Sequence, residues 1–277
     1  LNGLVYGGLL YILSVGLVLL FGLRRVVNFA HGALFMMGAY VGFTVAAIAG
    51  FWVGIVVSVV VLSIAGVLLD RFVFRLLQDE DPIVTVLVTF GLLLILEDAA
   101  RTIWGNDLHT LSTPALLSGV VQLGATSFPI YRLAIVGLAI AVAGGLNLWL
   151  RRSRVGLFVR ASSVDPVTTG MQGVNTERLS VMVVGLGAGL AGLSGTVAAP
   201  LLAISPNMGS SILIDCFVVV VTGGLSSFSG AFIAAMVIGQ LHNFGVVYVP
   251  WAASLIPLLL MVVVLFWRPQ GLAKSGS

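Results

Sequence analysis

Charged side chains are scarce in this sequence, and lysine is almost absent. Charged residues make up 8% of the 277 residues and hydrophobic residues 59%, whereas a soluble domain carries about 25% charged residues. The mean hydropathy is +1.16. This composition excludes an ordinary soluble domain and indicates an integral membrane protein.

Cysteine and histidine are also rare, and their placement excludes several chemistries. Cys216 is the only cysteine and lies in an apolar run, so a disulfide within the chain is excluded and a packed apolar role is expected. The three histidines lack the spacing of zinc ligands, and no serine or cysteine nucleophile has a base nearby in sequence. We therefore expect neither a metal site nor an enzyme active site.

A phosphate-binding loop of the form G-x-x-x-x-G-K-[ST] is missing, and the single lysine, Lys274, lies in the tail. The chain is thus predicted not to bind ATP through such a loop. It is also predicted to have no cofactor of its own. Energy for any transport must come from partners or from a gradient. The formal charge of +3 reports membrane topology rather than a nucleic-acid partner.

Apolar stretches of about 20 residues recur along the chain, long enough to cross a ~30 Å hydrocarbon core as helices. We predict a single transmembrane domain over residues 1–277, all-α and polytopic, with about eight to nine spans. Leu1 is not expected to be the natural start. The candidate spans are Gly3–Leu23, Val27–Ile48, Phe51–Leu69, Ile83–Ile103, Ile130–Leu150, Ser180–Ala203, Ser211–Leu225, Gly230–Val249 and Trp251–Trp267.

The seventh span is short and runs into "TGGLSSFSG", which predicts a broken or re-entrant helix. A second interruption, "NFAHGALFMMGAY", lies in the other half of the chain. Paired glycine-rich interruptions of this kind point to a transport pathway. Candidate gate or pathway residues at these places are Asn28, His31, Gly32, Asp215, Thr222 and Gly223.

The basic residues are distributed asymmetrically. We assume that the N-terminus lies outside and that the chain crosses the membrane an odd number of times. Eleven of the thirteen basic residues then lie inside, and only Arg101 and Arg132 lie near the outer face. The inner set is Arg24, Arg25, Arg71, Arg75, Arg151, Arg152, Arg154, Arg160, Arg178, Arg268 and Lys274. Residues 104–129 then form an external loop, with room for short strands, and residues 151–178 form a cytoplasmic loop.

The cytoplasmic loop carries the signals of a short helix. Asp165 can cap a helix, Pro166 suits its first position, and Gly173 can end it after about two turns. The alternative is a solvent-exposed loop whose arginines only determine the membrane topology. It would explain the charges but not the helix-start residues Asp165 and Pro166 or the helix-end residue Gly173. We favour a docking element for a cytosolic partner.

Small residues recur at four-residue spacing in the sixth span, at Gly185 and Gly189, at Ala188 and Gly192, and at Ala191 and Gly195. Such faces allow close helix approach. Packing within the chain is favoured over a dimer seam.

A histidine inside an apolar run requires an explanation. Asn28 and His31 would lie one turn apart on one helix face, and Gly32 would let another helix approach. His31 is also close in sequence to Arg24, which indicates a position near the inner face. We favour a structural hinge near the gate over direct contact with substrate.

The remaining intramembrane carboxylates leave a second function open. Glu97 and Arg101 can pair across one turn, with Asp98 facing elsewhere. Asp215 is the most isolated acidic residue in an apolar run. In a stand-alone channel or ion-coupled carrier, Glu97, Asp98 and Asp215 would be the coupling groups.

Three stretches together resemble the membrane permease subunits of branched-chain amino acid (Liv-type) ABC importers. They are "NFAHGALFMMGAYV", "GLFVRASSVDPVTTGMQGVN" and "VVVVTGGLSSFSGAFIAAMVIG". The resemblance spans almost the whole chain. Within the cytoplasmic loop, the positions that match the family's coupling loop are Gly156, Arg160, Ala161, Asp165 and Gly173.

The resemblance implies a multi-pass protein of the bacterial inner (plasma) membrane that moves a small solute. It implies a second permease subunit of similar fold, two cytosolic ATPase subunits that bind ATP and Mg, and an extracytoplasmic solute-binding protein. The implied substrates are branched-chain or related amino acids, or urea.

Overall fold

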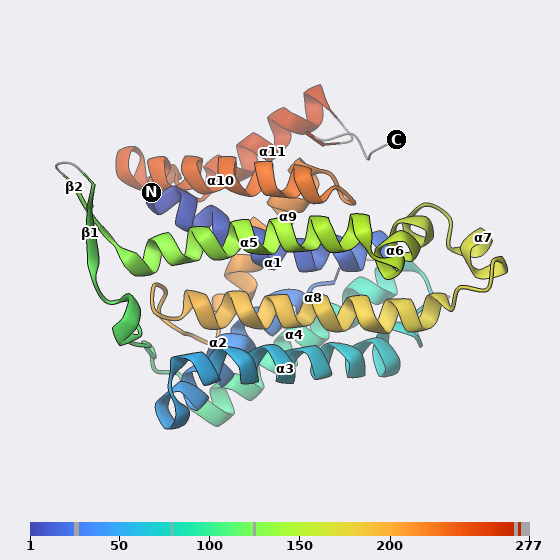
Figure 1. Ribbon diagram of the computed structural model, residues 1–277, viewed down its shortest axis with the longest axis horizontal. Helices are drawn as coiled ribbons and strands as arrows, with labels where there is room; N and C mark the ends of the chain where they lie inside the picture. The colour runs from blue at the N-terminus through green and yellow to red at the C-terminus, as the bar shows by residue number, and fades with distance from the viewer. Residues whose placement is uncertain (25–27, 79, 124–125, 269–270, 273–277) are drawn as a thin grey trace.

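The computed structural model describes residues 1–24, 28–78, 80–123, 126–268 and 271–272. Most of its helices lie side by side along the long axis of the molecule (Figure 1). One end carries a β-hairpin, and we call it the hairpin end. The other carries Arg24, Arg71, Arg151 and Arg160, and we call it the arginine-rich end. The N-terminus lies at the hairpin end (Figure 1).

Seven helices in the described part of the chain are long and apolar enough to cross a membrane. They are α1 (Asn2–Arg24), α2 (Ala30–Ala49), α3 (Phe51–Leu69, continued by the π-turn η1, Asp70–Phe74), α4 (Pro82–Trp104), α5 (Ile130–Arg152), α8 (Thr176–Ala198) and α10 (Phe228–Tyr248). Two shorter apolar helices are α9 (Met208–Gly223) and α11 (Leu255–Trp267). The all-α, polytopic class is confirmed, and each of the nine predicted spans corresponds to one of these helices.

Four predicted helix starts are displaced by three or four residues, at α2, α8, α9 and α11. The second span was expected from Val27, but α2 begins at Ala30, because the Asn28 side chain accepts the Ala30 N–H and turns the chain there. The ninth was expected from Trp251, but α11 begins at Leu255 after a 3₁₀ turn, η3 (Pro250–Ala252). Helix α9 has 16 residues, about 24 Å at 1.5 Å per residue. It ends at Gly223 and is followed by Gly224, whose φ of 104° favours glycine over residues with a side chain.

Helix α1 forms the centre of the bundle. Sixteen of its 23 residues are buried, against α10, α8, α5 and α9. Glycine permits the closest contacts: a Cβ on Gly16 would lie 2.7 Å from the carbonyl oxygen of Gly187, and one on Gly38 would lie 2.5 Å from Cα of Gly192. The small residues of α8 therefore serve packing within the chain, as predicted.

The segment between α4 and α5 contains short strands, as the sequence suggested. Strand β1 (Val120–Leu123) pairs antiparallel with β2 (Thr126–Pro129), after a 3₁₀ turn, η2 (Ala115–Leu117). His109 forms an isolated bridge with Ile204, which ties this segment to the connection between α8 and α9.

The segment between α5 and α8 holds two short helices, α6 (Arg154–Val164) and α7 (Pro166–Met171). The predicted helix after Asp165 is confirmed as α7, and Gly173 has the positive φ, 85°, expected beyond a helix end. Both helices lie at the arginine-rich end, and α7 is the outermost element there (Figure 1).

Candidate functional site

Side-chain caps fix the shape of the α6–α7 segment. The Ser153 hydroxyl accepts the Gly156 N–H at 2.8 Å and begins α6. The Asp165 carboxylate accepts the N–H groups of Val167 at 3.0 Å and Thr168 at 3.1 Å and begins α7. Such caps satisfy helix-end donors and contribute roughly 0.5–2 kcal/mol each. Asp165 thus positions α7 relative to α6.

Gly156 shapes the corner between α5 and α6. A Cβ there would lie 2.4 Å from the carbonyl oxygen of Leu150, so a larger residue would push the two helices apart. Arg160 and Ala161 are exposed on α6. The five predicted coupling residues therefore lie on one continuous segment, where Gly156, Asp165 and Gly173 shape the backbone and Arg160 and Ala161 present its surface.

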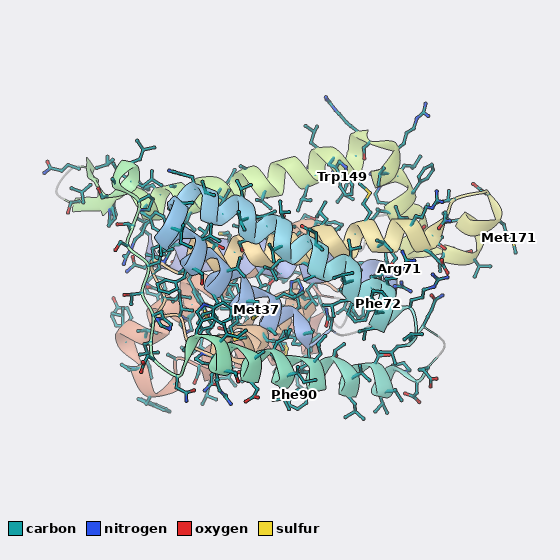
Figure 2. All side chains as sticks on the ribbon, turned by 90° about the horizontal axis from the view of Figure 1, so that it is seen from below. Met37, Arg71, Phe72, Phe90, Trp149 and Met171 are labelled. Atoms are coloured by element: carbon teal, nitrogen blue, oxygen red, sulfur yellow. The ribbon has the colours of Figure 1, made fainter. Side chains whose placement is uncertain are left out.

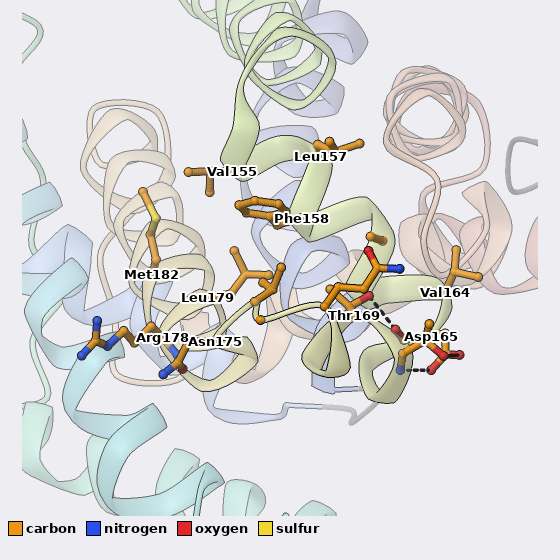
Figure 3. Close-up of a pocket in the computed structure, with 15 residues that line it drawn as sticks. Val155, Leu157, Phe158, Val164, Asp165, Thr169, Asn175, Arg178, Leu179 and Met182 are labelled. Atoms are coloured by element: carbon orange, nitrogen blue, oxygen red, sulfur yellow. Dashed lines mark hydrogen bonds between the residues drawn. The ribbon is translucent and has the colours of Figure 1, made fainter.

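A groove of about 790 Å³ runs between α6, α7 and the first turns of α8 (Figure 3). Its lining is mainly apolar and includes Leu157, Phe158, Leu179 and Met182, with polar groups at Asp165, Thr169, Asn175 and Arg178. We call it the α6–α8 groove.

Large apolar side chains are also exposed in this groove and on the segment beside it. Val164, Val167 and Met171 are 78%, 66% and 82% exposed. Met171 lies at the far tip of the molecule (Figure 2). Apolar side chains gathered on a protruding polar loop are typical of a protein-binding surface.

The predicted gate residues fall into three separate places. Asn28 is buried, but it precedes α2 rather than sharing a helix face with His31, so that prediction is wrong. Its Oδ1 accepts the Ala30 N–H at 3.0 Å, and its carbonyl accepts the His31 N–H at 3.3 Å. Its Nδ2 has no hydrogen-bond partner among the described residues.

His31 lies deeper than predicted. Its Nε2 donates to the carbonyl oxygen of Leu13 at 2.9 Å, and Leu13 is halfway along α1, not near the Arg24 end. The short sequence distance between Arg24 and His31 does not give the depth of His31 in the bundle, because α1 ends at Arg24 and the separate helix α2 begins only at Ala30. The ring is buried, and the bond from its Nε2 holds α2 against α1.

Gly32 is the point where α2 meets α9. A Cβ at Gly32 would lie 2.3 Å from the carbonyl oxygen of Gly209 and 2.9 Å from Cβ of Leu213. The close helix approach expected at Gly32 is therefore present, and its partner is α9.

Asp215 lies on another side of α9 and is half-buried. It accepts a hydrogen bond of 2.5 Å from the Tyr6 hydroxyl, and the Tyr6 ring stacks on His242 with centroids 4.7 Å apart. Thr222 and Gly223 lie at the far end of α9, where a Cβ on Gly223 would lie 2.6 Å from the Ala231 N atom. Gly223 thus packs against the start of α10, the Thr222 hydroxyl has no hydrogen-bond partner among the described residues, and neither residue meets Asp215.

The predicted Glu97–Arg101 pair is wrong. Arg101 donates instead to Oδ1 of Asn207 at 2.6 Å, a contact 106 residues away in sequence. Glu97 is buried and its Oε1 has no hydrogen-bond partner among the described residues, whereas Asp98 is exposed.

Sequence reasoning missed one polar centre at the arginine-rich end. Asp70, the first residue of the π-turn η1, is buried and binds Arg24 through both carboxylate oxygens, at 2.9 and 3.0 Å from Nη2. The Ser180 hydroxyl donates to the same carboxylate at 3.0 Å. An acidic residue directly after a 19-residue apolar span was the available signal. Arg25 and Lys274, counted as inner charges, lie outside the described residues.

Comparison with known proteins decides the family. The family model of the permease component of the branched-chain amino acid transport system matches residues 1–265. The chain belongs to this family. The permease is a multi-pass inner-membrane transport protein.

Relatives of similar length carry matching names. The permease is 27% identical to the high-affinity branched-chain amino acid transport system permease protein BraD of Pseudomonas aeruginosa, over 98% of this chain and 93% of the relative. It is 24% identical to the corresponding LivH of Escherichia coli strain K12, with the same coverage. A probable LivH from Methanocaldococcus jannaschii is 26% identical over 98% of this chain and 90% of the relative. No solved structure matches the chain.

Proposed function

We propose that this permease is the transmembrane subunit of an ABC importer that carries branched-chain or related amino acids inward. The match over residues 1–265 supports the transport role, and the relatives' names support the substrate class. ATP and Mg are bound by partner ATPase subunits, and this chain contributes no nucleotide site and no cofactor.

The observation that carries the coupling mechanism is the α6–α8 groove with the apolar residues around it. An ATPase subunit needs a surface that protrudes from the bilayer, presents apolar area and transmits force to a membrane helix. The α6–α7 segment protrudes at the arginine-rich end, and α8 continues from it into the core of the bundle (Figures 1 and 3). A partner that rotates α7 therefore acts on the helix that contacts α1, α2 and α3.

The tightly packed contacts of α8 supply the transmission. Backbone-to-backbone contacts at Gly187 and Gly192 leave no side chain to absorb a displacement, so α8 moves α1 and α2 with it. Near the inner end of α8, Ser180 also holds the Arg24–Asp70 pair. We assign Asn28, His31 and Gly32 to the hinge where α2 meets α1 and α9.

The arginine-rich end is proposed to face the cytosol, by the positive-inside rule. The hairpin end then meets the extracytoplasmic solute-binding protein, and residues 104–129 form the external loop. A second permease subunit of similar fold completes the pathway, and two ATPases dock on the pair.

A stand-alone channel or ion-coupled carrier is the competing function, with Glu97, Asp98 and Asp215 as coupling groups. It is less favoured because Asp215 already binds Tyr6, Asp98 is exposed on α4, and the docking segment would have no use.

Reconstitution tests the proposal. The permease, its partner permease and the ATPases are placed in proteoliposomes, and labelled leucine uptake is measured with and without binding protein and enclosed ATP. We expect uptake only when both are present. Uptake by the permease alone, driven by a proton or sodium gradient, would establish the carrier instead.

A further inference from the structure

One side of α4 is buried, and its composition is unusual for a helix at the edge of a membrane bundle. Helix α4 runs along one edge of the molecule, and most of its surface is open (Figure 2). Five residues at spacings of three or four form its buried stripe: Thr85, Thr89, Leu93, Glu97 and Ala100. Three of the five are polar, although polar groups inside a membrane are costly and mark pathways by default.

Glu97 is the one ionisable residue of the stripe, and its burial is the most costly. It is 6% exposed, and its Oε1 has no hydrogen-bond partner among the described residues. Arg101, the cation one helical turn away, donates a hydrogen bond to Asn207 rather than to Glu97. The ion pairs found in the described part of the chain join other carboxylates, Asp70 and Glu177. A buried carboxyl oxygen left unpaired is costly unless a ligand satisfies it.

The opposite end of the stripe has the complementary chemistry. The Phe29 N–H donates to Thr89 at 3.3 Å, which brings the start of α2 against α4. Beside this contact, Nδ2 of Asn28 and the hydroxyl of Thr85 are buried and have no partner among the described residues. An amide N–H and a hydroxyl can both donate to an anion.

An apolar section separates the two ends. Leu93 packs with Ala33 of α2 and Leu213 of α9. Phe29 meets Phe90 with ring centroids 6.0 Å apart and Phe217 with centroids 5.2 Å apart. The stripe therefore presents an acceptor, then an apolar barrier, then donors.

We infer that the buried side of α4 lines the solute path, and that Glu97 binds the ammonium group of a zwitterionic amino acid with an apolar side chain. Thr85, together with the Nδ2 of Asn28 at the start of the hinge, which is unpartnered among the described residues, then receives its carboxylate at a second station. Glu97 and Thr85 are twelve positions apart, about 18 Å along a helix, so one amino acid visits the stations in succession. This inference rests on the proposed function and names where the substrate is recognised.

Asp215 is less suited than Glu97 to bind an ammonium group. One of its carboxylate oxygens already accepts a hydrogen bond from the Tyr6 hydroxyl, and the Tyr6 ring stacks on His242. Asp215 therefore serves as the comparison carboxylate in the test.

The first measurement compares neighbouring acidic residues on α4. Glu97→Gln keeps the shape and hydrogen-bonding capacity but removes the charge, whereas Asp98→Asn makes the same change at an exposed position. Because the ammonium group loses its negatively charged partner, we expect leucine uptake below saturation to fall about ten- to a hundredfold in Glu97→Gln. We expect it to be unchanged in Asp98→Asn, with ATP hydrolysis retained in both. Normal uptake in Glu97→Gln, or a loss confined to Asp215→Asn, would overturn the inference.

A second measurement does not depend on the carboxylate. Leu93→Cys and Leu94→Cys are made in a Cys216→Ser protein that transports normally, since Leu93 is buried in the stripe and Leu94 is exposed on the outer side of α4. During ATP turnover, a water-soluble cationic thiol reagent should label Leu93→Cys and not Leu94→Cys, and leucine should slow the labelling. Equal protection of both cysteines during active transport would contradict the α4 path. If the Cys216→Ser complex and the wild type both failed to transport leucine, the proposed function would fail instead.

Discussion

Arg24 and Asp70 form a largely buried ion pair that joins the end of α1 to the π-turn after α3. Nη2 of Arg24 lies 2.9 and 3.0 Å from the two carboxylate oxygens, and Nε lies 3.2 Å from Oδ1. Ser180 adds a third helix to the same carboxylate. The pair therefore fixes the relative positions of α1, α3 and α8 where α8 continues into the docking segment.

Removing one partner of this pair is predicted to be far more damaging than removing both. Asp70→Leu alone leaves a largely buried guanidinium without its counter-ion, with Gln78 at 2.9 Å from Nη1 as its remaining partner among the described residues, and should lower the free energy of unfolding by roughly 3–5 kcal/mol. The double change Arg24→Met with Asp70→Leu should restore most of that loss. Thermal unfolding of the purified protein in detergent measures both. The exposed pair of Arg75 and Glu177 is the control, and Glu177→Gln should cost about 1 kcal/mol or less.

An equal loss at both pairs would mean that burial does not determine their contribution. It would also remove the reason for treating Asp70 as a structural centre of the inner end.

Gly32 is predicted to tolerate no side chain. Gly32→Leu should abolish leucine uptake, because a Cβ at this position already meets the Gly209 carbonyl oxygen at 2.3 Å. Gly91 on α4 provides a matched control, since a Cβ there meets nothing within 4 Å. Uptake and membrane insertion are measured for both variants. Full activity in Gly32→Leu would show that the α2–α9 contact is dispensable.

His31 is predicted to act through its hydrogen bond and not through its charge. Gln can donate to the Leu13 carbonyl as the histidine Nε2 does, but it does not titrate between about pH 6 and 8. His31→Gln should therefore keep much of the uptake across this range, whereas His31→Leu should lose most of it. A His31→Gln protein that assembles but loses transport and its pH response would place a titrating histidine in the pathway.

The orientation of the bundle can be tested by labelling. Single cysteines at Ser112 and Gln172, both exposed and at opposite ends of the molecule, are introduced into the Cys216→Ser protein. A membrane-impermeant thiol reagent added to intact cells should label position 112 and leave position 172 unlabelled until the cells are opened. The reverse pattern would place the docking segment outside the cell.

The helices were predictable because the lipid bilayer dictates their length and apolarity, and α7 was predictable because Asp165, Pro166 and Gly173 act locally. The contacts that define the candidate site were not. The four-residue spacing allowed an ion pair between Glu97 and Arg101, yet the Arg101 guanidinium donates to Asn207, which is distant in sequence.

The depth of His31 depends in the same way on a turn that spacing cannot reveal. The side chain of Asn28 binds the Ala30 N–H and delays the start of α2, so His31 meets the middle of α1. The buried stripe of α4 is visible only once α2 and α9 are known to pack on that side.

The central claim is that the α6–α7 segment docks an ATPase that drives transport. The most direct test places a photoreactive phenylalanine analogue at Met171, which is 82% exposed, and at Leu116, which is 77% exposed near the hairpin. After irradiation of the assembled importer, adducts are identified by mass. The account predicts an ATPase adduct from position 171 and none from position 116. An ATPase adduct from position 116, or a solute-binding-protein adduct from position 171, would contradict it.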